Sequence, residues 1–269
     1  MKEDLSKYNP EGSTLRKAQL RMLDMLIEID KIFRAHHINY WLDSGTLLGA
    51  VRHKGFIPWD DDVDVCVMRT DYKKIKEILR HELPHEFVFV DADIDKYYFD
   101  ACGRVKSVNS YVDIPEYRYQ KEQGIYIDIY PMEVLYSANH KYFGEKIYGK
   151  IFRHYHNSGM VVTSSFVRRN ITKIMACFLY PLVLGLIMLM RWWGLRRPNV
   201  IAHGFGIPLV RDHTYKSSWI FPLTEIEFEG RKLLAPNNYD ACLKSTYGDY
   251  MQIPPEEKRV VHSKNWKIW

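Results

Sequence analysis

The sequence contains little cysteine: four residues in 269, with no two of them closer than 36 positions. No CxxC pair occurs, so a zinc ribbon or a thioredoxin-like redox motif is excluded. We therefore expect a reducing compartment. The first 13 residues hold no apolar stretch, and we expect no secretory signal there.

Internal repeats and low-complexity tracts are also absent. With 46% hydrophobic and 26% charged residues, the chain has a globular composition, which excludes disorder, collagen and coiled coil for the chain as a whole. Its length allows one sizeable core or two modest ones. The basic excess is small, 38 Lys and Arg against 33 Asp and Glu. It permits an anionic substrate or a membrane surface without indicating either, and we expect no nucleic-acid partner.

Helical and strand patterns alternate along the chain. The apolar spacing predicts an amphipathic helix over residues 14–36, with Ser13 as its N-cap. A short strand at 38–42 is followed by a tight turn at Gly45 into a short helix. A further helix is predicted at 70–83, and strands at 63–67, 86–90, 99–105 and 124–130, the last one stopped by Pro131. This alternation favours an α/β (α+β) fold.

One segment, Ile174–Met190, runs for 17 residues without a charge and contains Pro181. It is shorter than the roughly 20 apolar residues that cross a bilayer. Three interpretations stay open: a buried core helix, a transmembrane span, and a helix that lies in the membrane interface. The Trp192-Trp193 pair beside arginines favours the third, so peripheral membrane contact through 174–193 is predicted.

The densest functional signal is a run of acidic residues, Asp60, Asp61, Asp62 and Asp64, directly ahead of alternating valines. Carboxylates this close repel one another unless a cation neutralises them. Residues two apart on a strand share a face, so Asp62 and Asp64 are expected to point the same way. Such a pair suits Mg²⁺, which prefers a few carboxylates together with phosphate oxygens.

This run has two other interpretations. An exposed acidic turn is the common one, but the valines place the run at a strand entrance. An EF-hand calcium loop fails, because its sixth and twelfth positions require Gly and Glu where the sequence has Val65 and Asp71. The metal-binding pair is therefore preferred.

A third carboxylate, Asp128, lies between isoleucines in the predicted strand 124–130. An unpaired charge there would be costly to bury. A metal shared with Asp62 and Asp64 would remove that cost, and an arginine partner is the alternative. Asp128 is thus a candidate third ligand or catalytic group.

Several other residues are candidates for substrate binding. Gly45 and Thr46 offer exposed amides, a hydroxyl and a helix N-terminus, which together suit a phosphate. Arg52 could add positive charge around an anionic substrate, or lie on the solvated surface. Arg104 and Lys106 could contact a donor phosphate or merely edge a sheet, and His262 could line the site or be structural.

These residues carry a family resemblance. The stretch Tyr40–Val65, which includes the glycine turn and the acidic run, resembles the signature of the LicD family, whose best-known members transfer phosphocholine; fukutin and fukutin-related protein share it. The similarity continues at Met68–Tyr72, Ile127–Pro131 and Tyr247–Met251, and at Pro254, Pro255 and His262. It covers most of the chain and is weakest at 137–200.

The resemblance implies a nucleotidyltransferase-like fold, a mixed sheet flanked by helices. In that pattern Gly45 and Thr46 match the turn, Asp62 and Asp64 match the metal pair, and Asp128 matches the third acid. Asp60 matches an auxiliary acidic position. The family's donors are CDP-activated alcohols such as CDP-choline or CDP-ribitol, and its acceptors are hydroxyls of glycans, lipid-linked glycans or teichoic acid precursors.

We therefore expect a Mg²⁺- or Mn²⁺-dependent phosphotransferase that releases CMP, located in the cytoplasm at the inner face of the cell membrane. The expected organisation is a catalytic core at 1–136, a helical membrane-associated insertion at 137–200, and a completing segment at 201–269. A metal-dependent glycosyltransferase is the alternative enzyme, although it lacks the upstream glycine-threonine turn. A membrane-associated scaffold is the non-enzymatic alternative.

Overall fold

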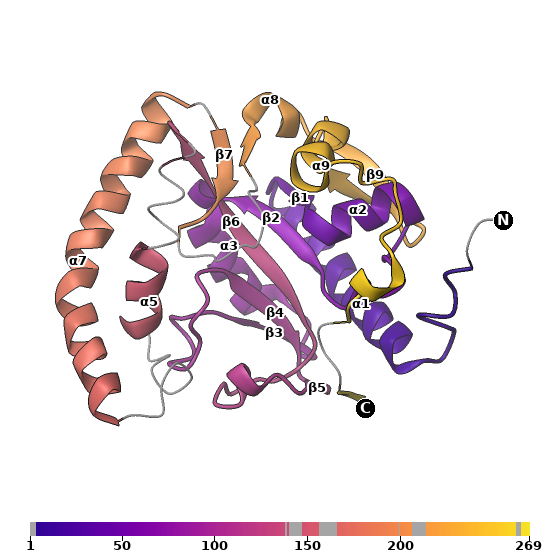
Figure 1. Cartoon of the computed structure of the whole chain (residues 1–269), viewed down its shortest axis with the longest axis horizontal. Coiled ribbons are helices and arrows are strands. Elements are labelled where there is room, and N and C mark those ends of the chain that lie inside the picture. Colours follow the sequence, from indigo (N-terminus) through magenta and orange to yellow (C-terminus); the bar gives the residue numbers. More distant parts are fainter. Residues whose placement is uncertain are drawn as a thin grey trace.

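The computed structural model describes residues 4–137, 139, 147–155, 166–198, 200–205, 214–261 and 265–269. Its centre is a seven-stranded mixed sheet with the path β1-β2-β6-β4-β3, to which β7 and β8 add beyond β6 (Figure 1). The strands of this sheet are β1 (Tyr40–Leu42), β2 (Asp64–Met68), β3 (Phe87–Val90), β4 (Gly103–Ser107), β6 (Tyr126–Leu135), β7 (Val200–His203) and β8 (Thr214–Lys216). Only β2 and β6 pair in parallel among them. The predicted mixed sheet flanked by helices is confirmed.

The two faces of the sheet differ in polarity. One face carries Val65, Val67 and Ile129, which join the main apolar core together with α1 (Thr14–Ala35) and α3 (Arg69–Glu82). The other face carries the acidic residues described below. The predicted first helix is confirmed, and its Ser13 hydroxyl accepts a hydrogen bond from the Arg16 amide at 3.2 Å, as an N-cap does.

Smaller elements surround the β1 side of the sheet. They are α2 (Ser44–His53), α8 (Ser217–Ile220), the hairpin β9 (Thr224–Phe228) and β10 (Arg231–Ala235), α9 (Tyr239–Tyr247), and the 3₁₀ turn Glu256–Lys258. On the other side, β5 (Ser110–Val112) pairs with β11 (Trp266–Ile268), and a 3₁₀ turn covers Pro115–Tyr117.

The prediction that Pro131 ends its strand is wrong, since β6 runs on to Leu135. β4 pairs with β6 only as far as Ile129, and β7 begins at Met132, so Pro131 lies in the gap between them. The Asp128 amide donates to β2, and amides alternate sides along a strand. The missing N–H of Pro131 therefore faces that gap, where no partner is lost.

The predicted strand 99–105 is shifted, because β4 begins at Gly103 and ends at Ser107. Phe99 and Cys102 are buried outside the sheet, which explains why the apolar pattern starts early. The strand also includes Lys106, whose ammonium donates to the Gln120 side chain at 2.7 Å. A buried partner thus allows a charged residue inside the strand.

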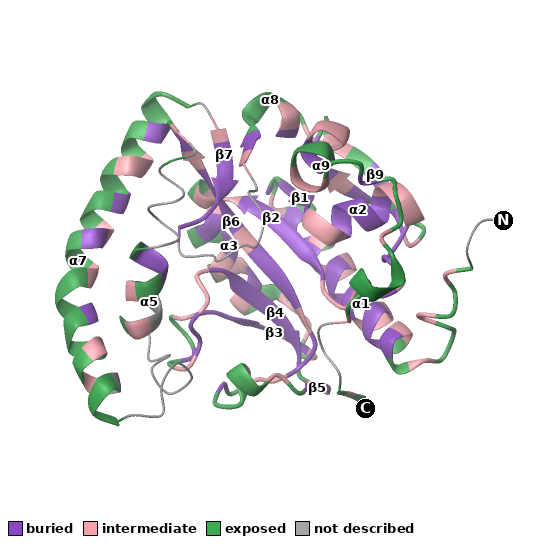
Figure 2. Cartoon of the chain, in the orientation of Figure 1, coloured by how far each residue is buried: buried purple, intermediate pink, exposed green. Residues whose placement is uncertain are grey.

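The predicted apolar helix is longer than its uncharged run. It forms α7 (Phe166–Arg196), 31 residues that continue through Pro181, and it packs beside α5 (Gly149–Tyr155). Ala176, Val183 and Ile187 face the body of the protein, whereas most of the helix surface is exposed (Figure 2). The exposed outer side excludes the interpretation as a buried core helix.

Among the described residues, α7 is the one helix whose length and apolar composition would allow a membrane crossing, with 17% of its most apolar window buried. This alone is weak support for a span. α7 is attached to the sheet by Glu133, whose carboxylate accepts from Arg191 at 2.7 Å and from Arg69 at 3.0 Å.

Candidate active site

The parallel register of β2 and β6 places Asp64 directly opposite Asp128. The Asp128 amide donates to the Val63 carbonyl at 3.0 Å, which fixes this register at the start of both strands. Burial raises the pKa of Asp64 well above its usual value, and the charges of Asp62 and Asp128 raise it further. Asp128 therefore lies close enough to Asp64 and Asp62 for their charges to interact, although it is more than 60 residues away in the sequence.

Asp60 belongs to the same cluster. Its pKa is raised by burial, then by the charges of Asp62 and Asp61, and its carboxyl shares a hydrogen bond with that of Asp62. Asp60 and Asp62 are half-buried, and carboxylates this close favour ionising together only when a cation compensates their charge. Because hard oxygen ligands suit Mg²⁺ or Mn²⁺, Asp60, Asp62, Asp64 and Asp128 could hold such an ion.

Asp128 has an arginine partner as well as an acidic neighbour. The Arg104 Nε donates to its Oδ1 at 2.6 Å, and the Tyr130 hydroxyl donates to its Oδ2 at 3.3 Å. Burial raises the pKa of Asp128, and Arg104 acts against that shift. The arginine partner predicted as the alternative for Asp128 is thus present, and the shared metal stays a prediction.

Thr46 performs a task that its sequence position does not reveal. Its buried Oγ1 accepts a hydrogen bond from the Asp64 amide at 2.9 Å. The Asp43 amide in turn donates to the Asp64 carbonyl at 3.2 Å. The N-terminus of α2 is thus bonded to the backbone of the acidic strand, and Thr46 positions Asp64; its predicted contact with a phosphate stays a prediction.

Gly45 lies where a side chain would collide with the acidic cluster. A Cβ at this position would come within 2.7 Å of the Asp60 Oδ2. Both residues line a cavity of about 530 Å³ at this side of the cluster. Its walls include Arg52, Trp59, Tyr250 and Lys258.

Arg52 reaches into this cavity from α2. Its guanidinium donates to the Tyr250 carbonyl at 2.8 Å and to the Gln252 carbonyl at 3.1 Å. Burial lowers the pKa of Arg52, and the charge of Asp60 acts against that shift. Basic side chains and aromatic rings beside clustered carboxylates suit an anionic ligand that carries a ring and arrives with a divalent cation.

The other two predicted basic residues are buried. Arg104 pairs with Asp128 and, at 2.9 Å, with Asp100, while the Lys106 ammonium donates to Gln120 and, at 2.7 Å, to the Glu122 carbonyl. Burial lowers the pKa of Lys106 to about 7. The edge strand on this side of the sheet is β3, and β4 lies between β3 and β6. The interpretation that Arg104 and Lys106 lie at the edge of the sheet is therefore wrong. His262 lies outside the described residues.

A second polar cluster was not predicted from the sequence. The His203 Nε2 lies 2.9 Å from the Asp43 Oδ2 and 3.6 Å from the Cys66 Sγ, and all three residues are buried. The Tyr215 hydroxyl donates to the Asp43 Oδ1 at 3.1 Å. These groups could also hold a metal ion. The only sequence signal is that Asp43 immediately precedes the glycine turn, because His203 lies beyond the insertion.

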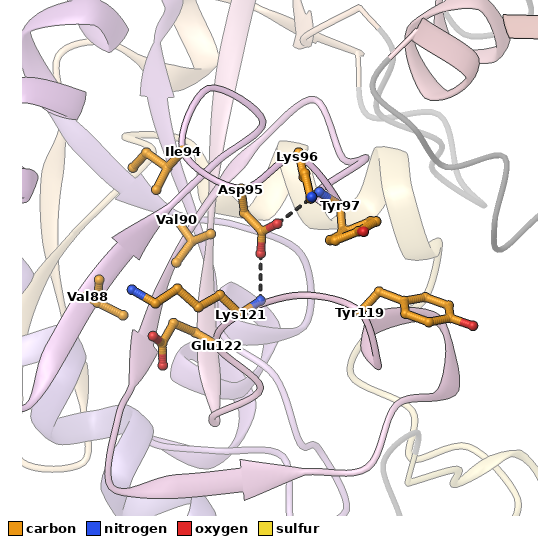
Figure 3. Close-up of a pocket in the computed structure, with 9 residues that line it drawn as sticks. All are labelled: Val88, Val90, Ile94, Asp95, Lys96, Tyr97, Tyr119, Lys121 and Glu122. Atoms are coloured by element: carbon orange, nitrogen blue, oxygen red, sulfur yellow. Dashed lines mark hydrogen bonds between the residues drawn. The ribbon is translucent and has the colours of Figure 1, made fainter.

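One more cavity, of about 390 Å³, lies along the outer strand β3 (Figure 3). Its apolar lining residues are Val88, Val90 and Ile94. Asp95 points into the loop beside it and accepts from the amides of Tyr97 and Lys121, both at 2.8 Å. Neither the four clustered carboxylates nor the side chains that contact Asp128 (Cys102, Arg104 and Tyr130) line this cavity, so it is separate from the acidic site.

Comparison with known proteins connects this geometry to one family. The family model described as "LicD/FKTN/FKRP, nucleotidyltransferase domain" matches residues 37–193, more than half of the chain. The lipopolysaccharide cholinephosphotransferase LicD of Haemophilus influenzae is 27% identical over 262 residues, covering 93% of this chain and 96% of that protein. The ribitol 5-phosphate transferase FKRP of human and mouse is 40% identical over 47 residues, covering 18% of this chain and 10% of those proteins.

Proposed function

This chain belongs to the LicD/FKTN/FKRP family of nucleotidyltransferase domains, and we propose that it transfers a phospho-alcohol group from a CDP-alcohol to a hydroxyl of a cell-envelope glycan. Phosphocholine is the first candidate group, because the relative that matches over nearly its whole length is a cholinephosphotransferase. The observation that carries the proposal is the strand register that sets Asp64 opposite Asp128.

The proposal includes a divalent cation, Mg²⁺ or Mn²⁺, held by Asp62, Asp64 and Asp128 with Asp60 as an auxiliary ligand. The residues fit such an ion, since burial and mutual repulsion raise the pKa values of Asp60 and Asp64, and a cation would remove that repulsion. When bound, the cation would neutralise the charge of the donor diphosphate.

The transfer is a displacement at phosphorus. The acceptor hydroxyl oxygen bonds to the phosphorus that carries the alcohol, the bond from that phosphorus to the bridging oxygen breaks, and CMP leaves. The product is a phosphodiester between the acceptor and the alcohol. Asp128 either takes the proton from the attacking hydroxyl or completes a second metal site.

The cavity at Gly45 and Asp60 is the proposed donor site. Arg52 and Lys258 supply positive charge for the diphosphate, and the rings of Trp59 and Tyr250 supply surfaces for a base. The corresponding test is isothermal titration with CDP-choline, CDP-ribitol and UDP-sugars, each with and without Mg²⁺.

Metal-dependent binding of a cytidine nucleotide, followed by mass analysis that finds CMP and a phosphodiester product, is the expected result. A preference for UDP-sugars would favour the glycosyltransferase instead. If the protein binds no nucleotide, the non-enzymatic scaffold is the function that would remain. Each outcome selects one of the three functions.

We also propose that α7 lies on the cytoplasmic face of the cell membrane through residues 174–193. Support comes from its outer side, where Phe178, Leu182 and Leu189 are 75%, 67% and 63% exposed. The Arg196 guanidinium lies over the Trp192 ring at 4.1 Å, a pairing of cation and indole that suits the headgroup layer.

Vesicle flotation tests this contact. Wild-type protein is expected to float with vesicles that contain anionic lipid, and the double variant Phe178→Asp/Leu182→Asp is expected to stay in solution with an unchanged Tm. Val108→Asp, at a residue that is 38% exposed in a turn away from α7, is the matched control. Flotation of the double variant at the wild-type level would exclude the contact.

A further inference from the structure

A third cavity, of about 420 Å³, lies between the sheet and the helices α5 and α7. One wall comes from α3 and the loop that follows β3, with Lys76, Asp91 and Cys102. The opposite wall comes from α5 and α7 and is aromatic, with Tyr155 and Tyr180. Cavities of this size hold small-molecule ligands, for which roughly 300–1,000 Å³ is typical.

Only the side chain of Cys102 stands between this cavity and Asp128 of the acidic cluster at their point of contact. The thiol of Cys102, which lines it, points at the Asp128 Oδ1 at 3.8 Å. Asp100 lines it too and is joined to Asp128 through Arg104. The donor cavity, by contrast, ends at Gly45 and Asp60. The clustered carboxylates therefore separate two cavities.

This arrangement matches the geometry of a displacement at phosphorus. The attacking and leaving oxygens lie roughly in line on opposite sides of the phosphorus. If the nucleotide occupies the cavity at Asp60, the acceptor must approach from the Asp128 side. Of the three cavities described for this part of the chain, the one beside Cys102 borders Asp128.

The lining fits a sugar. The Tyr155 and Tyr180 rings stack on each other with centroids 4.1 Å apart and planes 8° from parallel, and Tyr180 also stacks on Tyr148, so these rings form an aromatic wall. An aromatic wall can pack against the apolar C–H face of a pyranose ring. On the facing wall, Lys76 is paired with Asp91 at 2.6 Å, and these charged groups can donate to and accept from sugar hydroxyls.

We propose that this cavity is the acceptor subsite, that it takes a sugar unit, and that Tyr155 and Tyr180 determine which acceptor is used. The proposal rests on the phosphotransferase function proposed above. It makes the insertion part of the active site, although the acidic residues all lie outside it.

The test compares Tyr155→Ala and Tyr180→Leu with wild-type enzyme. Methyl glycosides of glucose, galactose and N-acetylglucosamine are the acceptor probes, and CDP-choline is the donor. Each variant is expected to raise the acceptor KM at least tenfold. The donor KM and the acceptor-independent hydrolysis of CDP-choline should stay within twofold of wild type, with an unchanged Tm.

Tyr119→Ala is the matched control. Tyr119 and Tyr155 are both 38% exposed, but Tyr119 lines the separate cavity along β3 (Figure 3). Its removal should leave the acceptor KM unchanged.

Three results would overturn the proposal. The first is an unchanged acceptor KM in both variants of an active enzyme. The second is a rise in the donor KM instead, which would place the donor alcohol in this cavity. The third is a wild-type enzyme that hydrolyses CDP-choline but uses none of the sugars. A wild-type protein that neither binds nor hydrolyses any CDP-alcohol would remove the proposed function itself, and this subsite with it.

Discussion

Asp64 offers the sharpest test of the acidic cluster, through the change Asp64→Asn. The side chain is 8% exposed and faces Asp128, and burial followed by neighbouring charges raises its pKa. A carboxyl whose pKa is raised by folding stabilises the protein below the unfolded pKa of 3.8 and loses that contribution as the pH rises through the folded value. At neutral pH, where an unfolded aspartate is ionised, the raised pKa of Asp64 therefore destabilises the metal-free protein.

The size of the effect follows from the pKa difference. Each pKa unit corresponds to about 1.4 kcal/mol. For a chain of this size, 1 kcal/mol shifts the Tm by roughly 2–4 °C. Asp64→Asn should thus raise the Tm of the metal-free protein at neutral pH by about 3–6 °C for every unit of pKa elevation that it relieves. The gain should shrink as the pH falls toward 4, and turnover should drop at least about 100-fold.

Thermal unfolding in EDTA and in Mg²⁺, at several pH values, measures the pH dependence of the Tm and the effect of the metal on it. Mg²⁺ should raise the Tm of the wild-type protein clearly and that of the variant little. Asp113→Asn makes the same chemical change at an exposed carboxylate after β5, and it should alter neither the Tm nor the turnover. A lower Tm for Asp64→Asn in EDTA at neutral pH, or turnover near the wild-type level, would refute the electrostatic account of the cluster.

Three other predictions concern the surroundings of the site. Thr46→Val removes the acceptor of the buried Asp64 amide and should cost about 1–3 kcal/mol together with turnover, whereas Thr46→Ser should retain both; thermal unfolding and product formation measure this. Because burial lowers the pKa of Lys106 to about 7, this lysine should make the wild-type protein more stable as the pH rises from 7 toward 10.5, and urea unfolding of Lys106→Met should lack that gain. Glu133→Gln leaves Arg69 and Arg191 without their shared carboxylate and should speed amide hydrogen exchange along α7; unchanged exchange would show that apolar packing alone holds the helix.

The parts of the fold that local pattern dictates were predictable. The helix from Thr14 shows a clear 3.6-residue period and an N-cap serine, and both are present as expected. The error at Pro131 has a different origin. Whether a proline ends a strand depends on whether its missing N–H faces a neighbour. The gap here lies between β4 and β7, which are about 95 residues apart in the sequence.

The same distinction holds for the site. A period of two along a strand predicted Asp62 and Asp64 on one face; β2 begins at Asp64, so Asp62 lies in the segment before the strand and this part stays a prediction. A buried carboxylate at Asp128 pointed to a partner, and Arg104 is one. The hydrogen bond from the Asp64 amide to Thr46 and the contact of His203 with Asp43 depend on how distant segments come together. No spacing in the sequence encodes them.

The strand β6 explains how α7 is connected to this site. Its first half pairs with β4 and carries Asp128, and its second half pairs with β7 and carries Glu133, the residue that holds Arg191 of α7. A single continuous strand therefore connects the acidic cluster to α7, with the proposed acceptor cavity between them. If α7 lies on the bilayer as proposed, this cavity lies beside the lipid headgroups. A lipid-linked glycan could then enter it without leaving the membrane, while the water-soluble nucleotide enters from the Asp60 side.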